Sequence, residues 1–274
     1  MIDRDLIKRA LAEDLQGGED ITSVATVSGS EKVVADFVSR KTGVVAGIDM
    51  ARAVLEEVGL TDIAVLVQDG TPVKPGDTLM TVRGDTRAIL LAERTALNFL
   101  GHLSGIATLT RTWVDAVDGT SCKVRDTRKT TPGMRLLEKY AVRMGGGTNH
   151  RMSLSDAALI KDNHIAAAGG VAEAFSKVRA KFPTSEIEIE VDTLEQLREV
   201  LPLKPDLVLL DNMSPAQCSE AVSIVAGATK LEASGGISLE NAKAYAITGV
   251  DYLAIGALTH SAPVFDIGLD LRAE

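Results

Sequence analysis

Residues 123 to 151 hold the densest group of side chains that could bind an anion. Two of them are acidic, Asp126 and Glu138, and eight are basic: Lys123, Arg125, Arg128, Lys129, Arg135, Lys139, Arg143 and Arg151. The window therefore carries a net charge of +6, although the whole chain carries −9. Cations on the walls of a concave site concentrate their field on a small charged ligand. The window predicts a pocket for such an anion.

A solvated helix face is the competing interpretation for part of this window. Arg135, Lys139 and Arg143 recur every four residues, which is typical of one exposed side of a helix, and we expect these three to be mostly such a face. The basic residues beside Thr, Pro and Gly are expected to bind the ligand instead, and these are Arg128, Lys129 and Arg151.

The composition argues against several classes of partner. A pI near 5.1 and only 3% aromatic residues make nucleic acid an unexpected ligand. Cys122 and Cys218 have no metal-ligand spacing, which favours a reducing compartment. The N-terminus is charged, and no apolar run approaches the roughly 18 residues that a spanning helix needs. We expect a cytoplasmic protein without membrane contact.

Two sequence patterns meet near residue 115. Residues 1–114 begin with an amphipathic helix over 3–15, continue with alternating runs such as VVADFVSR, and end in a helical segment from about Arg87 to Val117, interrupted around Gly101 to Gly105. This pattern predicts a small α+β domain. The alternating run VFDIGLDLR lies within residues 264–274, which are expected to return to that domain as a strand.

Residues 115–263 repeat a short apolar run, a polar loop and a helical stretch. Six runs are recognisable, at 122–126, 157–162, 186–192, 207–212, 230–234 and 252–256. Such repeats indicate a parallel barrel-like sheet, although connectivity alone also permits a doubly wound sheet. Most runs end in a charged or special residue, among them Asp126, Lys161, Glu190, Asp211, Ser234 and Gly256. Because the carboxyl ends of barrel strands meet at one mouth, these residues favour an incomplete barrel with its site there.

Two strand ends contain glycines that could hold phosphate. LEASGGIS places Ser234, Gly235 and Gly236 after a strand and before a helix expected to begin near Ser238, and Gly256 ends the next run. Glycine lets backbone N–H groups approach phosphate oxygens closely. By contrast, the glycines at 145–147 are expected to form a flexible turn that positions Asn149, His150 and Arg151.

The string RDTRKTTPGMRLLEKYAVRMGGGTNHRMSLSDAALIKDNHI closely resembles the signature of the quinolinate phosphoribosyltransferases. Further segments resemble that family in the same order, including EDLQGGEDITS, AERTALNFLGHLSGIAT, EIEVDTLEQL, LVLLDNMSP, LEASGGI and GVDYLAIGALTHS. The resemblance covers essentially the whole chain. It implies an N-terminal α/β sandwich domain followed by an incomplete parallel α/β barrel of six to seven strands.

The resemblance also implies the reaction, a pentosyl transfer in NAD biosynthesis. Quinolinate and phosphoribosyl pyrophosphate would give nicotinate mononucleotide, pyrophosphate and CO2. The residues implied around the quinolinate carboxylates are Arg128, His150, Arg151 and Lys161, with Arg94 supplied by the neighbouring subunit of a homodimer or higher oligomer. From the residues alone, Arg94 would be interpreted as forming a helix salt bridge with Glu93 or a nearby acid.

A second set of residues is implied for phosphoribosyl pyrophosphate and its Mg2+. Lys129 and Lys161 would face the phosphates, and Glu190 and Asp211 would lie near the ribose hydroxyls and the metal, which makes these four the expected catalytic residues. The 5-phosphate would lie on Ser234, Gly235 and Gly236 and near Gly256. Magnesium takes one or two carboxylates plus phosphate oxygens, which suits Glu190 and Asp211 as metal ligands.

Some assignments remain open at this level. His164 could orient Lys161, line the pocket or make a structural hydrogen bond, whereas His102 and His260 are expected to be structural. Three rival functions share parts of the pattern: a nicotinate phosphoribosyltransferase, a related group associated with molybdenum transport, and a non-catalytic anion-binding barrel. The number of cations, the intact IKDNH and the carboxylates Glu190 and Asp211 argue against these rivals in turn.

Overall fold

The computed structural model describes residues 2–272 and divides the chain into two compact units. One unit comprises Met1–Arg111, Leu137–Gly146 and Ser261–Glu274, and the other comprises Thr112–Leu136 and Gly147–His260. These bounds differ from the expected division near residue 114, because a segment from the middle of the chain is grouped with the N-terminal unit. No helix within residues 2–272 has the length and apolar character needed to cross a membrane.

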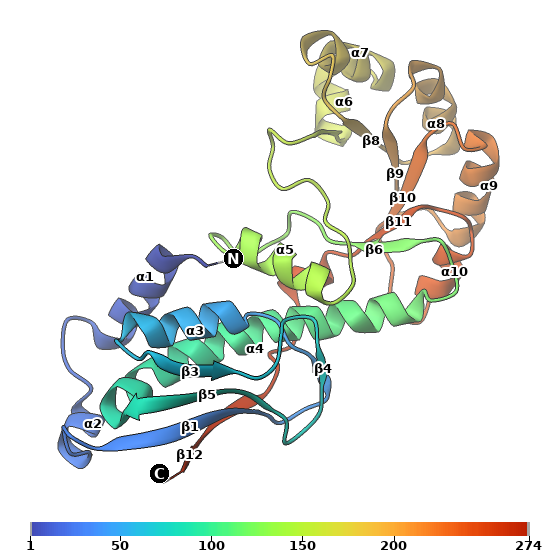
Figure 1. The fold of residues 1–274 in the computed structure, drawn as a ribbon. Coiled ribbons are helices and arrows are strands. Elements are labelled where there is room, and N and C mark those ends of the chain that lie inside the picture. Colours follow the sequence, from blue (N-terminus) through green and yellow to red (C-terminus); the bar gives the residue numbers. More distant parts are fainter. Residues whose placement is uncertain (1, 273–274) are drawn as a thin grey trace. The chain divides into compact units, whose positions relative to one another are not determined.

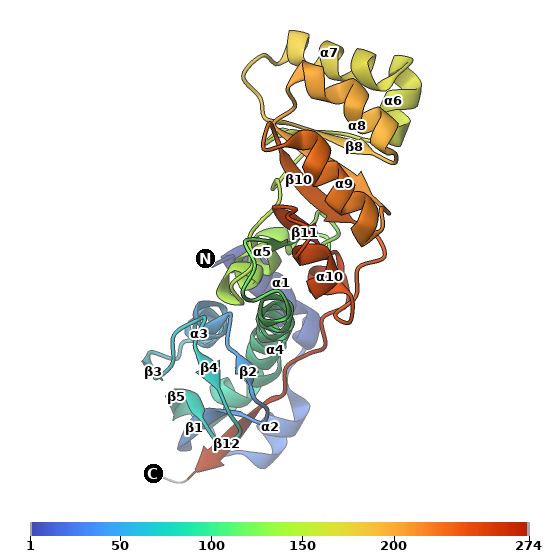
Figure 2. The ribbon, with the colours of Figure 1, turned by 90° about the vertical axis from the view of Figure 1, so that its right-hand side faces the viewer.

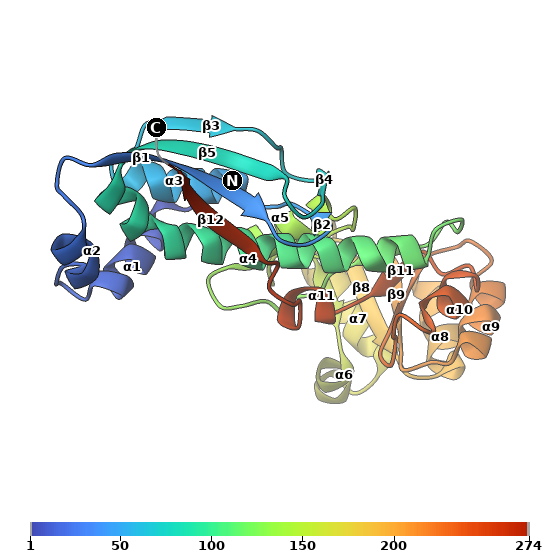
Figure 3. The ribbon, with the colours of Figure 1, turned by 90° about the horizontal axis from the view of Figure 1, so that it is seen from below.

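The first unit is built on an antiparallel sheet with strand order β12-β1-β5-β3. The strands of this sheet are β1 (Lys32–Ser39), β3 (Asp62–Val65), β5 (Thr78–Asp85) and β12 (Ile267–Arg272). The helices are α1 (Arg4–Leu15), α2 (Ile21–Thr26), α3 (Ile48–Glu57) and α4 (Thr86–Ala116). Two short strands, β2 (Gly43–Val44) and β4 (Pro72–Val73), pair with each other. Helices α3 and α4 run along one face of the sheet (Figures 1 and 3). The C-terminal run is β12, and its Leu269 pairs with Phe37 of β1.

Helix α4 is continuous, so the expected interruption around Gly101 to Gly105 is wrong. Both glycines are places of close packing. A Cβ on Gly105 would lie 2.1 Å from the carbonyl oxygen of Pro263, and Gly101 O accepts a 2.9 Å hydrogen bond from Phe265 N. A glycine inside a helix costs only about 1 kcal/mol relative to alanine, which buried neighbours such as Leu103 readily offset.

The second unit is an open sheet of six parallel strands with order β6-β11-β10-β9-β8-β7. The strands are β6 (Lys123–Arg125), β7 (Ala158–Ile160), β8 (Ile187–Val191), β9 (Leu207–Asp211), β10 (Lys230–Ser234) and β11 (Tyr252–Ala254). A single bridge from Thr148 to Arg125 adds a short seventh segment beside β6. The incomplete parallel barrel of six to seven strands is confirmed.

Helices follow the strands of this unit along its outer side (Figure 2). They are α6 (Asp162–Ala168), α7 (Val171–Lys181), α8 (Leu194–Val200) with the short helix Leu201–Leu203, α9 (Pro215–Val225), α10 (Ala242–Ala246) and α11 (Ala257–His260). Strand β8 is buried along its whole length and β9 along all but its last residue, as expected for parallel strands covered on both faces.

Helix α5 (Arg135–Met144) corrects the expected solvated face. Arg143 is exposed, and Arg135 is half-buried with its guanidinium bonded to Thr130 Oγ1 and Met152 O. Lys139, however, is fully buried. The four-residue spacing of the charged residues gives no sign of this burial. Helix α5 has a wide buried face that includes Leu137 and Val142, and Lys139 lies on that face.

Candidate active site

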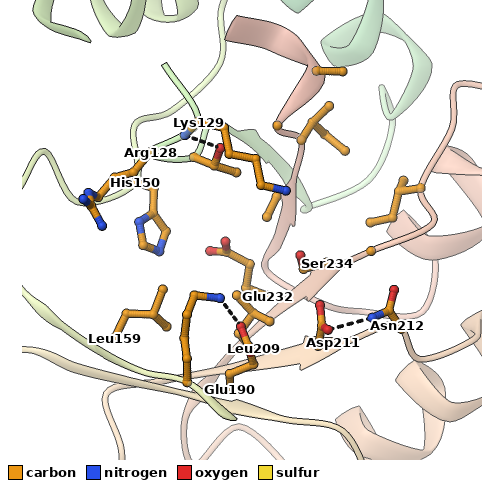
Figure 4. Close-up of a pocket in the computed structure, with 18 of the residues that line it drawn as sticks. Arg128, Lys129, His150, Leu159, Glu190, Leu209, Asp211, Asn212, Glu232 and Ser234 are labelled. Atoms are coloured by element: carbon orange, nitrogen blue, oxygen red, sulfur yellow. Dashed lines mark hydrogen bonds and ion pairs between the residues drawn. The ribbon is translucent and has the colours of Figure 1, made fainter. Parts of the chain in front are cut away.

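The carboxyl ends of the parallel strands surround a pocket of about 700 Å3. Eleven of the sequence-predicted residues line it: Arg128, Lys129, His150, Arg151, Lys161, Glu190, Asp211, Ser234, Gly235, Gly236 and Gly256. Figure 4 shows His150, Glu190, Asp211 and Glu232 around the same space, with Lys129 and Ser234 at its side. The structure thus brings together residues that are up to 128 positions apart, from Arg128 to Gly256.

Two arginines form the basic part of the wall. Arg151 is anchored by its Nη1, which donates a 2.7 Å hydrogen bond to Ala157 O. Burial lowers the pKa of Arg151, and the nearby positive charge of Arg128 lowers it further. The buried Nε of Arg128 has no hydrogen-bond partner within the described residues. Two guanidinium groups in the wall of one pocket can each hold a carboxylate with parallel N–H groups.

His150 is held in place by groups from two strands. Its backbone N donates a 2.8 Å hydrogen bond to Asp126 Oδ1, and its Nε2 lies 2.5 Å from Glu188 Oε2. Asn149 Nδ2 donates to the second oxygen of Asp126. The turn before this segment is packed rather than flexible, because a Cβ on Gly145 would lie 2.4 Å from Ala107 O.

Lys161 forms an ion pair with Glu190 across the pocket, from the end of β7 to β8. Its backbone N donates a 3.0 Å hydrogen bond to Nδ1 of His164, which caps α6. His164 therefore holds the backbone of Lys161, and it does not line the pocket described above. The side chain of Lys161 is 46% exposed, which leaves it accessible to a ligand.

Asp211 ends β9 inside the same pocket. Burial raises its pKa, and Lys161 and Lys129 oppose that rise. Its Oδ2 accepts a 2.6 Å hydrogen bond from Nδ2 of Asn212, a residue with a left-handed backbone (φ 54°). The pocket is thus lined by three carboxylates, Glu190, Asp211 and Glu232, together with several cations.

The two glycine loops of the pocket follow β10 and β11. Gly235 has φ +84°, and a Cβ there would lie 2.1 Å from Asn212 Oδ1. A Cβ on Gly256 would lie 3.1 Å from Cδ of Lys129, and α11 begins directly after it. The expected helix start near Ser238 is wrong, because α10 begins at Ala242. Before it, Ser238 N donates a hydrogen bond to the side chain of Asn241, whose Nδ2 donates to Gly236 O.

Gly235→Ala is expected to raise KM for the phosphate-bearing substrate about tenfold, equivalent to ~1.4 kcal/mol. The added Cβ must push Asn212 away from the loop, in addition to straining a left-handed backbone. Gly227→Ala is the matched control, because Gly227 has φ +82° with open space around its Cβ position. It should cost about 1–2 kcal/mol of unfolding free energy and leave KM unchanged. Equal KM values for the two variants would contradict a ligand-binding loop.

Several pocket residues were missed or misjudged from the sequence. His260 was expected to be structural but lines the pocket, and Thr127 was missed. Asn212 and Glu232 also line it; both were expected at the polar strand ends of the barrel mouth, but without an assigned role. The buried acid Glu188 was also missed, although EIEIEVD alternates and so places Glu188 and Glu190 on the same side of the strand. His102 lies in the first unit, where its Nε2 is 2.9 Å from the buried Glu138.

Arg94 is the one predicted site residue that is absent from the lining of this pocket. It lies on α4 in the first unit and is exposed. Within residues 2–272, the alternative interpretation of Arg94, a helix salt bridge with Glu93 or a nearby acid, is not formed within 4.0 Å.

The fold and the pocket define an α/β barrel protein whose pocket at the strand ends is lined by arginines and lysines. Two protein-family models match the chain: the quinolinate phosphoribosyl transferase N-terminal domain over residues 20–104 and the corresponding C-terminal domain over residues 106–270. The chain therefore belongs to the quinolinate phosphoribosyltransferase family. Members of this family are transferases that make nicotinate mononucleotide from quinolinate and phosphoribosyl pyrophosphate, with decarboxylation, in NAD synthesis.

Individual relatives agree along nearly the whole chain. The chain is 56% identical over 274 residues to the nicotinate-nucleotide pyrophosphorylase (carboxylating) of Mycobacterium leprae (strain TN), covering 98% of this chain and 96% of the relative. A crystal structure of nicotinate-nucleotide pyrophosphorylase from Ehrlichia chaffeensis superposes with a TM-score of 0.94 at 41% identity, covering 98% of both chains. A crystal structure of a NadC deletion mutant gives a TM-score of 0.96 at 38% identity, covering 99% of this chain and 96% of the other.

Proposed function

We propose that the pocket binds both substrates of the family reaction at once and divides them between its two sides. Quinolinate is assigned to the side with Arg128, His150, Arg151 and Lys161, because two adjacent carboxylates match two guanidinium groups and further cations. The observation that carries this assignment is the pair of arginines in the wall of one pocket, close enough for the positive charge of Arg128 to lower the pKa of Arg151.

The other side is assigned to phosphoribosyl pyrophosphate. Ser234, Gly235, Gly236 and Gly256 would hold the 5-phosphate with backbone N–H groups, and Lys129 and Lys161 would face the pyrophosphate. Glu190 and Asp211 suit Mg2+, since two carboxylate donors, rather than a complete ligand cage, match an ion that keeps waters and takes substrate phosphate oxygens. When bound, magnesium would neutralise charge on the departing pyrophosphate.

The proposed chemistry requires no covalent intermediate with the protein. As pyrophosphate leaves, C1 of the ribose gains cationic character, which the carboxylates Glu190 and Asp211 would stabilise, while Lys129 and Lys161 would stabilise the leaving group. The pyridine nitrogen then bonds to C1 and becomes positive. That positive charge stabilises the electron pair left on the ring carbon when the adjacent carboxylate departs as CO2, and a proton completes the product.

A direct assay tests this assignment. The purified protein is incubated with quinolinate, phosphoribosyl pyrophosphate and Mg2+, and nicotinate mononucleotide is followed, with parallel reactions that contain EDTA or replace quinolinate by nicotinate. We expect product only with quinolinate and Mg2+. Folded protein that forms none, or that prefers nicotinate, would refute the assignment.

We further propose a homodimer in which Arg94 of one subunit reaches the pocket of the other. The exposure of Arg94 and its absence from the pocket of its own chain support this arrangement. Mixing inactive Arg94→Ala and Lys161→Ala proteins should then restore up to about a quarter of wild-type activity, because random hybrids place one intact site in half of the dimers, with one site each. Hybrids that are shown to form by native mass spectrometry but stay inactive would contradict a shared site.

A reducing compartment, the cytoplasm, fits the two cysteines. Cys122 and Cys218 are both buried and free, and burial raises the pKa of Cys122 to about 12 and that of Cys218 to about 11. Neither thiol is prepared for disulfide exchange.

A further inference from the structure

The barrel interior directly beside the pocket is charged, which is unusual for this fold. Barrel interiors are generally filled with branched apolar side chains. Here Glu188 is 4% exposed and Glu232 is fully buried. Figure 4 shows the carboxylate of Glu232 directed toward His150. Burying a charge costs free energy, so these acids require an explanation other than packing.

Each acid contacts a side chain that either belongs to residues 149–151 or is hydrogen-bonded to them. Glu188 Oε2 lies 2.5 Å from Nε2 of His150. Glu232 Oε2 accepts a 2.7 Å hydrogen bond from Arg125, whose guanidinium packs over the ring of Tyr252 and whose Nε donates to Asn149 O. Glu188 therefore restrains the ring of His150, and Glu232 restrains the carbonyl of Asn149 through Arg125. Asp126 holds the backbone N–H of His150.

The arrangement is costly for stability. Burial raises the pKa of Glu188 to about 7 against the opposing effects of Arg125, Arg151 and Lys161. The second oxygens, Oε1 of Glu188 and of Glu232, have no hydrogen-bond partner within the described residues. A buried polar atom without a partner destabilises the fold. The two carboxylates are therefore held inside the barrel by their partners His150 and Arg125 and not by favourable packing.

We propose that Glu188 is a positioning residue that fixes the imidazole of His150 for the quinolinate carboxylates. This inference rests on the proposed function of the pocket. The backbone of His150 is already fixed by Asp126, and Glu188 removes the remaining freedom of the ring. A ligand that binds a fixed donor pays less ordering entropy than one that binds a mobile donor, so the benefit appears as quinolinate affinity.

The test compares Glu188→Leu and Glu188→Gln with wild type in three measurements: quinolinate affinity by calorimetry, KM for each substrate, and Tm. Loss of a residue that orients a ligand-binding histidine is expected to weaken quinolinate binding about 10- to 100-fold. KM for phosphoribosyl pyrophosphate should stay within about twofold. Glu188→Gln keeps an acceptor and should recover part of the affinity. Glu188→Leu leaves Nε2 of the buried His150 without its carboxylate and should lower Tm, whereas Glu188→Gln should lower it less.

Glu186→Gln is the matched control, because Glu186 is exposed and precedes the same strand, and it should change none of these quantities. Unchanged quinolinate affinity in Glu188→Leu would overturn the inference. So would a fall in Tm that accompanies equal losses for both substrates, because that pattern indicates a structural role. If Glu188→Leu does not fold, the same criteria apply to Glu188→Gln. Failure of the proposed function is distinguishable, because the wild-type protein would then neither bind quinolinate nor form product.

Discussion

Lys161→Ala is expected to lower kcat/KM for nicotinate mononucleotide formation by about 10²- to 10³-fold, the usual effect of removing one preorganised electrostatic group. Lys161 ends β7 in the pocket, pairs with Glu190 and is the cation assigned to both substrates. The substitution removes stabilisation of the leaving pyrophosphate, so kcat should fall more than KM rises. Steady-state kinetics with each substrate varied in turn measures both effects.

The control for this prediction is Lys181→Ala, which removes an exposed lysine from the end of α7 without touching the pocket. It should leave kcat/KM within about twofold of wild type. Circular dichroism and Tm establish that both variants are folded. A Lys161→Ala protein with nearly normal kcat, or a loss that is confined to KM, would show that Lys161 binds ground-state substrate and does not act on the leaving group.

Arg151→Gln is expected to raise KM for quinolinate about 10- to 100-fold, because a hydrogen bond to a charged partner contributes about 1.5–3 kcal/mol. Glutamine can donate to a carboxylate but cannot present two parallel N–H groups with a positive charge. The variant should not lose stability in proportion. Burial and the positive charge of Arg128 lower the pKa of Arg151, so its charge is not expected to stabilise the free protein. Tm should therefore change little, even though affinity falls.

Arg143→Gln provides the comparison from the same basic window, since Arg143 is exposed on α5. It removes the same charge from the chain, and its KM for quinolinate should match that of wild type. If both variants raise KM equally, the long-range charge of the window, rather than the contact made by Arg151, controls binding. Raising the salt concentration separates these cases, because screening weakens a long-range field more than a buried contact.

The sequence predicted well those features of the fold and the site that depend on residues close together in the chain. Apolar runs with polar ends located all six strands of the barrel, because a parallel strand covered on both faces must be apolar until it reaches the mouth. The same logic located Lys161, Glu190 and Asp211 at strand ends. A match along the whole chain to a known family then connected these residues to one reaction.

Other features depended on contacts between distant segments. Lys139 looks solvent-facing by its spacing, but α5 packs so that this side chain is buried. Gly101 and Gly105 look like helix breaks, yet they allow residues 263–265 to approach α4. His260 looked structural because nothing adjacent in sequence distinguishes it, whereas the fold brings α11 to the pocket.

By itself, the sequence determined the barrel, its mouth and most of the residues that line it, because strand period and strand-end polarity are local properties. Only the tertiary structure decided which acids are buried. Glu190 and Glu188 share one face of β8, but Glu190 reaches Lys161 in the pocket while Glu188 is enclosed against His150. Burial is a property of the assembled interior, where desolvation by residues from several strands sets the charge state and cost of each carboxylate.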